Sequence, residues 1–149
     1  MLIAENLIAL DLAAADKQQI IQILAEKAAK AGRINSVSKY ASAVMQREFD
    51  YSTAIGFGTA ISHGKSDSVI DPFLMFATLK VTNWLGQDNE PVNMIFLIGV
   101  PADAPSIIHL KILARLSRLI MHREFRAALQ SAESSSSVFK LLTDFELDF

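Results

Sequence analysis

The chain has 149 residues, 51% of them apolar, which fits one compact domain with a core that needs no covalent staples. Lys and Arg number 14 and Asp and Glu 16, and the formal net charge of −2 gives no support for nucleic acid or an anionic membrane as the partner. The lack of cysteine excludes disulfides, thiolate nucleophiles and cysteine-ligated metals.

Two amphipathic helices are predicted in the first third of the chain. Asp16 begins a capping-box pattern, and the apolar residues after it recur at helical spacing as far as Gly32, which can end a helix. The second helix is predicted from about Ser36 to Glu48 or Phe49. Its apolar stripe has spacings of three and four: Val37, Tyr40, Ala41, Val44 and Met45.

Strands are predicted in the middle of the chain. Residues 50–64 are rich in Gly, Ser and Thr, and they predict a short strand or strand pair that ends at His63. Phe73 to Val81 predicts a further strand. Val92 to Val100 is a nearly continuous apolar run, which is typical of a strand covered on both faces.

Helical patterns return in the last third. A long helix is predicted from about Ile107 to Met121, a short one from Arg123 to Gln130, and another from Val138 to Phe145. The serine run from Ser134 to Ser137 predicts a loop or a helix start. Helices, then strands, then helices indicate an α/β fold in which helices cover a mixed β-sheet.

No segment has the pattern of a secretion signal or a membrane anchor. Met1 to Asp11 contains the acidic Glu5 and no basic flank, unlike a signal peptide. The longest apolar run, Met94 to Val100, is far shorter than the roughly 20 residues that span a bilayer. We therefore expect a soluble, cytoplasmic protein with no direct membrane insertion.

The three histidines are the first candidates for chemistry. His63 lies where an apolar segment meets a glycine, a common place for a reactive group, although a turn histidine bonded to the backbone is the commoner case. His109 falls in the first turn of the long helix, where the dipole disfavours an added proton and free N–H groups attract an anion. A polar residue without chemistry is equally common at a helix end. His122 is expected to be solvated.

Two further residues could bind phosphate oxygens. Arg47, at the end of the second helix, could offer forked donors, or it could be a solvated arginine favoured by the helix C-terminus. Thr53 could donate a hydroxyl hydrogen bond, or it could bond the backbone as loop threonines do. The sequence contains no dinucleotide, Walker, nucleophile-elbow or zinc-ligand motif.

These residues together resemble the fructose/mannitol-type IIA family of bacterial sugar phosphotransferase systems. That family has an Arg-Glu pair, a Thr-x-x-Gly-x-Gly segment and an Ile-Pro-His-Gly motif, followed later by a His-Leu-x-x-Leu-Ala-x-Leu helix. The matching segments here are Arg47-Glu48, Thr53-Ala54-Ile55-Gly56-Phe57-Gly58, Ile61-Ser62-His63-Gly64 and the helix from His109 to Leu116. Ser62 stands where the family usually has proline.

The resemblance implies one domain over residues 1–149, with helices on both faces of the sheet, that acts as a phosphohistidine carrier. It implies that His63 accepts and donates the phosphoryl group, that His109 supports the phosphate, that Arg47 neutralises charge, and that Thr53 adds a weaker hydrogen bond. The implied donor is the phosphocarrier HPr, and the implied acceptor is a IIB component of a sugar permease. A neutral imidazole is nucleophilic near pH 7 and forms a covalent intermediate, so the scheme requires no cofactor or metal.

Other functions stay open at this point. Nitrogen-regulatory IIA proteins share the fold and the histidine, and they act on partner proteins through their phosphorylation state. A third hypothesis is a non-catalytic binding module of the same fold, and a metal-dependent hydrolase is a distant fourth. If the carrier function is right, partners must reach His63, and we expect apolar side chains such as Ile55 and Phe57 around it.

Overall fold

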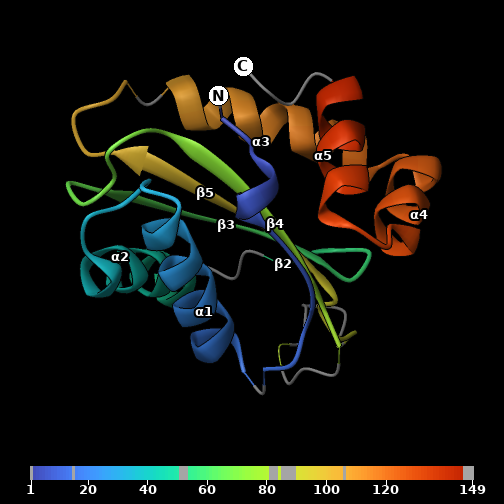
Figure 1. Ribbon diagram of the computed structural model, residues 1–149, viewed down its shortest axis with the longest axis horizontal. Helices are drawn as coiled ribbons and strands as arrows, with labels where there is room; N and C mark the ends of the chain where they lie inside the picture. The colour runs from blue at the N-terminus through green and yellow to red at the C-terminus, as the bar shows by residue number, and fades with distance from the viewer. Residues whose placement is uncertain are drawn as a thin grey trace.

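A computed structural model describes residues 2–14, 16–50, 54–80, 84, 90–105 and 107–145, without the side chains of Asp50 and Ile108. Its sheet has five strands: β1 (Ile8–Leu12), β2 (Ala54–Gly56), β3 (Thr59–Ser66), β4 (Phe73–Leu79) and β5 (Met94–Pro101). Their order is β1-β4-β5-β3-β2 (Figure 1). The pairs β1–β4 and β3–β5 are parallel, and β4–β5 and β2–β3 are antiparallel. The sheet is therefore mixed, as predicted.

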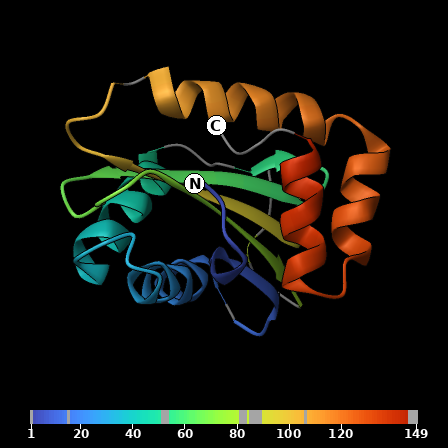
Figure 2. The ribbon, with the colours of Figure 1, turned by 45° about the horizontal axis from the view of Figure 1, so that its top comes forward.

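Helices cover both faces of this sheet, as Figure 2 shows from a second direction. One face carries α1 (Lys17–Lys30) and α2 (Val37–Asp50), and the 3₁₀ turn η1 (Glu5–Leu7) precedes β1. The other face carries α3 (Ile107–Ile120), α4 (Arg123–Ser131) and α5 (Ser135–Asp144). The prediction of an α/β fold with helices on both faces is confirmed.

The central strand β5 contributes to two separate cores. Successive side chains of a strand point to opposite faces, and β5 is buried from Met94 to Val100. Its Ile95 and Leu97 pack under α1 and α2, whereas Phe96 and Ile98 pack under α3, α4 and α5. This double burial explains the nearly continuous apolar run in the sequence.

Local signals set the helix ends. Asp16 Oδ1 accepts a hydrogen bond from the Gln19 N–H at 2.9 Å, which confirms the predicted cap of α1. Gly32 adopts a left-handed φ of 77° directly after that helix. Ser134 Oγ accepts from the Ser137 N–H at 3.1 Å, so the serine run starts α5.

Two sequence predictions are wrong. A strand, β1, precedes the helices, and it forms only because Ile8 and Ala9 pair with β4, a partner distant in sequence. β3 also continues past His63 to Ser66, since β5 supplies a parallel partner for each of its residues as far as Pro101. His63 therefore lies within a strand and not at its end.

α2 approaches β3 closely because Gly64 has no side chain. A Cβ at that position would lie 2.7 Å from Val44 Cγ2 and 3.0 Å from Tyr40 Cε1. The Tyr40 hydroxyl also donates to the Ile98 carbonyl at 2.8 Å. This packing fixes α2 over the half of β3 that contains His63.

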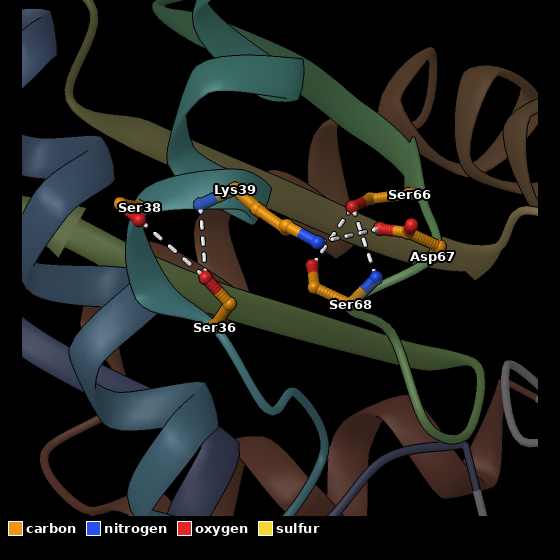
Figure 3. A network of polar contacts seen from close by, with 6 residues as sticks. All are labelled: Ser36, Ser38, Lys39, Ser66, Asp67 and Ser68. Atoms are coloured by element: carbon orange, nitrogen blue, oxygen red, sulfur yellow. Dashed lines mark hydrogen bonds and ion pairs between the residues drawn. The ribbon is translucent and has the colours of Figure 1, made fainter.

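One exposed ion pair links the N-terminal end of α2 to the turn that follows β3 (Figure 3). Lys39 Nζ lies 3.8 Å from Asp67 Oδ1, and both side chains are exposed. Ser66 Oγ and Ser68 Oγ are 2.8 Å apart within the buried side of the turn. Ser66 Oγ also accepts from the Ser68 N–H at 3.1 Å, so the turn has an internal brace.

Candidate active site

His63 projects from β3 toward the face of the sheet that carries α3. Ile61, two residues earlier on the strand, belongs to the core under α3, and side chains at this spacing share a face. Ser62 and Gly64 point the other way, toward α2. The His63 side chain is partly exposed, so it is both seated in the fold and reachable from solvent.

The ring of His109 stacks against the ring of His63. Their centroids lie 5.4 Å apart and their planes differ by 19°. His109 stands in the first turn of α3, and its Nδ1 atom is buried without a hydrogen-bond partner among the described residues. Two residues separated by 46 positions in the chain thus form one site, with the start of α3 directly beside His63.

Burial and nearby cations keep both rings neutral. Burial first, then the Arg47 guanidinium, then His109 lower the pKa of His63 from 6.5 to about 4. Burial and the Lys65 ammonium lower the pKa of His109. At pH 7 the His63 ring therefore keeps a free nitrogen lone pair, which a nucleophile requires.

Arg47 reaches this site from the opposite face of the sheet. It lies in the last turn of α2, yet its charge acts on His63. β2 pairs with β3 only at Thr59 and Ala60, and among the described residues no strand flanks β3 beyond that point on this side. An arginine from one layer thus acts electrostatically on a histidine that faces the other layer.

Lys65 is a member of this site that the sequence analysis did not single out. It lies two residues after His63 on β3 and therefore projects to the same face. Its Nζ donates to the Ala104 carbonyl at 3.0 Å, which ties β3 to the segment that leads into α3. Strand periodicity would have indicated Lys65 if β3 had been extended beyond His63.

Large apolar side chains are exposed on α2 and α3, which supply site residues, and on the strand and turn that precede β3. Ile55 and Phe57, the two expected in the sequence analysis, have 42% and 48% of their surface exposed. The others are Phe49 at the end of α2 and Ile107 and Leu110 at the start of α3. Exposed apolar side chains beside a polar centre are typical of a protein-docking surface.

Thr53 and His122 are the other residues that the sequence analysis considered. Thr53 lies outside the described residues. His122 is exposed at the N-cap of α4 and makes no side-chain cap hydrogen bond. Within the described ranges there is no group of three or more His, Asp or Glu that could hold a metal ion. None of the helices described has both the length and the apolar character that crossing a bilayer requires.

Comparison with known families decides what kind of protein this is. The family model described as "Phosphoenolpyruvate-dependent sugar phosphotransferase system, EIIA 2" matches residues 1–145. The chain belongs to this family. It is 36% identical to the PTS system fructose-specific EIIA component of Haloferax volcanii over 93% of this chain and 90% of that protein. It is 33% identical to the nitrogen regulatory protein of Bradyrhizobium diazoefficiens over 85% of this chain and 82% of that protein.

Solved structures of EIIA proteins share the fold. Nitrogen regulatory protein IIA-Ntr from Neisseria meningitidis superposes with a TM-score of 0.86 at 23% identity, covering 95% of this chain and 96% of that one. The IIA mannitol protein of Escherichia coli, solved in complex with phosphorylated IIB mannitol, gives a TM-score of 0.78 at 21% identity, covering 97% and 98%. The resemblance to the fructose/mannitol-type IIA fold is confirmed.

Proposed function

We propose that this chain is a cytoplasmic phosphohistidine carrier that accepts a phosphoryl group on His63 from phosphorylated HPr and passes it to a IIB component for sugar uptake. The observation that carries the proposal is the partly exposed, neutral ring of His63, stacked on His109 and within the field of Arg47. A neutral imidazole with cationic and N–H donors around it is suited to hold a phosphoryl group reversibly.

The transfer needs no proton movement at His63. The lone pair of a ring nitrogen attacks phosphorus, a P–N bond forms, and the bond between phosphorus and the donor atom breaks. Negative charge spreads over the three equatorial oxygens in the transition state. In this proposal, Arg47 and the backbone N–H groups at the start of α3 stabilise that charge; the effect of Arg47 on His63 and the position of His109 in the first turn of α3 support it. In the onward transfer, an acceptor atom attacks phosphorus, the P–N bond breaks, and the same groups stabilise the charge.

His109 and Thr53 have supporting roles in this proposal. Because Nδ1 of His109 is buried, Nε2 is the nitrogen left to donate a hydrogen bond to a phosphate oxygen. The ring stays neutral under the influence of burial and Lys65, so it can donate without adding a second full charge beside His63. Thr53, as in the family signature, would add a weaker hydroxyl hydrogen bond.

The exposed apolar side chains around the site support docking of partner proteins. Phe49, Ile55, Phe57, Ile107 and Leu110 offer contact surface on several sides of the elements that hold His63, His109 and Arg47. The acceptor group that we propose lies outside residues 1–149, because these residues include no cysteine. The IIA mannitol protein that shares this fold was solved with a phosphorylated IIB partner, which supports an acceptor of that class.

A regulatory role is the second candidate, and the nitrogen regulatory relative favours it. Both roles use phosphorylation of His63, and they differ in the partner protein: a IIB component in transport, or a regulated protein in the second case. Ser62, the departure from the usual proline, is 1% exposed and faces α2. The substitution therefore alters the packing behind His63 and leaves the docking surface unchanged, so it favours neither role.

Mass spectrometry after incubation with phosphoenolpyruvate, enzyme I and HPr tests the proposal. We expect one phosphoryl group on the intact chain, mapped to His63, and none on the His63→Ala variant. His122→Ala is the matched control and should be labelled like the wild type. Labelling of His63→Ala at the wild-type rate would refute the assignment. Onward transfer to an added IIB component supports transport, and a stable phosphoprotein in its presence supports regulation.

A further inference from the structure

A partly buried ion pair joins the end of α2 to the start of α1. Lys17 Nζ lies 3.0 Å from Glu48 Oε1, and the Glu48 side chain is only 1% exposed. The same ammonium lies 5.5 Å from the ring centroid of Trp84, which is itself buried. Glu48 follows Arg47 directly in the chain, so whatever holds Glu48 also constrains Arg47.

Glu48 occupies a core position. Tyr40, Ala41 and Val44 form the buried stripe of α2, and Glu48 continues it one turn beyond Val44. An apolar side chain is the usual occupant of such a position, because a buried carboxylate loses hydration that its partner only partly restores. Packing alone does not explain a charge here.

The two helices do not explain the pair either. Lys17 is the first residue of α1, where the positive end of the helix dipole disfavours a cation. Glu48 lies in the last turn of α2, where the negative end disfavours an anion. Each charge is unfavourable for its own helix. The attraction between Lys17 and Glu48 across the two helices offsets this cost.

We propose that Glu48, paired with Lys17 beside Trp84, is a positioning residue that fixes the last turn of α2 so that Arg47 faces His63. The contact between Gly64 and Val44 sets how near α2 lies to β3. At the opposite end of the helix, the exposed Lys39–Asp67 pair at 3.8 Å adds little. The Lys17–Glu48 pair restrains the C-terminal turn of α2, which contains Arg47. On a helix, residues 47 and 48 project about 100° apart, so Glu48 points into the core while Arg47 projects in another direction, from which its charge acts on His63.

Glu48→Gln tests this, because it keeps the shape of the side chain and removes its charge. We expect the rate of phosphoryl transfer from phospho-HPr to fall by about tenfold or more, since a misplacement of about 1 Å costs up to about 10²-fold. NMR titration should show a raised pKa of His63, since the nearby guanidinium lowers it. Lys39→Met, which breaks the exposed pair at the other end of α2, is the control and should change neither quantity.

A double-mutant cycle separates positioning from general loosening of the fold. In an Arg47→Met background, Glu48→Gln should slow transfer by less than about twofold, because the group it positions is gone. Equal slowing in both backgrounds would overturn the proposal, as would a Glu48→Gln protein with wild-type transfer and an unshifted His63.

A second pair of variants covers the case in which Glu48→Gln does not fold. Lys17 is 36% exposed and tolerates change more readily. Lys17→Gln should reproduce the effects of Glu48→Gln, and Lys17→Arg should restore wild-type behaviour; identical behaviour of the two would count against the ion pair. The kinetic tests depend on the proposed function, but the His63 titration does not. If the wild type accepts no phosphoryl group, the titration still decides whether Glu48 positions Arg47.

Discussion

Gly64→Ala is the substitution whose effect follows most directly from the geometry. The added Cβ would lie 2.7 Å from Val44 Cγ2, whereas carbon atoms pack at about 3.5–4.0 Å. The overlap of roughly 1 Å cannot be relieved by Cβ itself, so α2 must move away from β3. Overpacking costs about 1–3 kcal/mol, and the lost flexibility of glycine in the unfolded chain returns about 0.4–1 kcal/mol. The midpoints of these ranges leave a net loss of about 1.3 kcal/mol, which lowers Tm by roughly 3–5 °C for a chain of this length.

Circular dichroism melting and the phosphoryl transfer assay measure the two consequences. We expect the lower Tm together with slower transfer well below it, because the shift of α2 carries Arg47 with it. Val44→Ala in the Gly64→Ala background is the internal test. Removing the clashing methyl group should cost less there than in the wild type, where it only opens a cavity. An unchanged Tm for Gly64→Ala, or strictly additive effects of the two substitutions, would refute the steric explanation.

Three further predictions concern the ionisation of the site. His109→Ala should fold normally yet slow transfer, and NMR should show a small rise in the pKa of His63, because His109 lowers it; wild-type transfer would reject a role for His109. Arg47→Met should raise the same pKa further and slow transfer by about 10²–10³-fold, the usual loss for one preorganised donor; an unshifted titration would place the guanidinium elsewhere. Because the folded pKa of His63 is about 4 and the unfolded value 6.5, the unfolded state binds the proton first as pH falls, so stability should decline between these values. His63→Gln should reduce that decline in urea melts, and an identical pH profile would contradict it.

The sequence by itself determined most of the helices and the candidate for the reactive group. Asp16 and Gly32 set the ends of α1 through interactions within a few residues, so local pattern suffices there. The apolar run of β5 also predicted that this strand is buried on both faces. The motif around His63 and the helix start at His109 pointed to the two histidines, but the sequence did not predict that their rings stack.

Only the tertiary structure decided how those groups meet. β1 exists because β4 is beside it, and its five residues carry too short a pattern to predict a strand alone. Arg47 influences His63 because α2 packs against β3, and Lys65 joins the site because β3 continues past His63. The pairing of Lys17 with Glu48 was equally hidden, since each residue on its own looks like an ordinary charge at a helix end. Periodicity and capping act over a few residues, whereas sheet pairing, ion pairs between helices and shared electrostatic fields depend on which distant segments fold against one another.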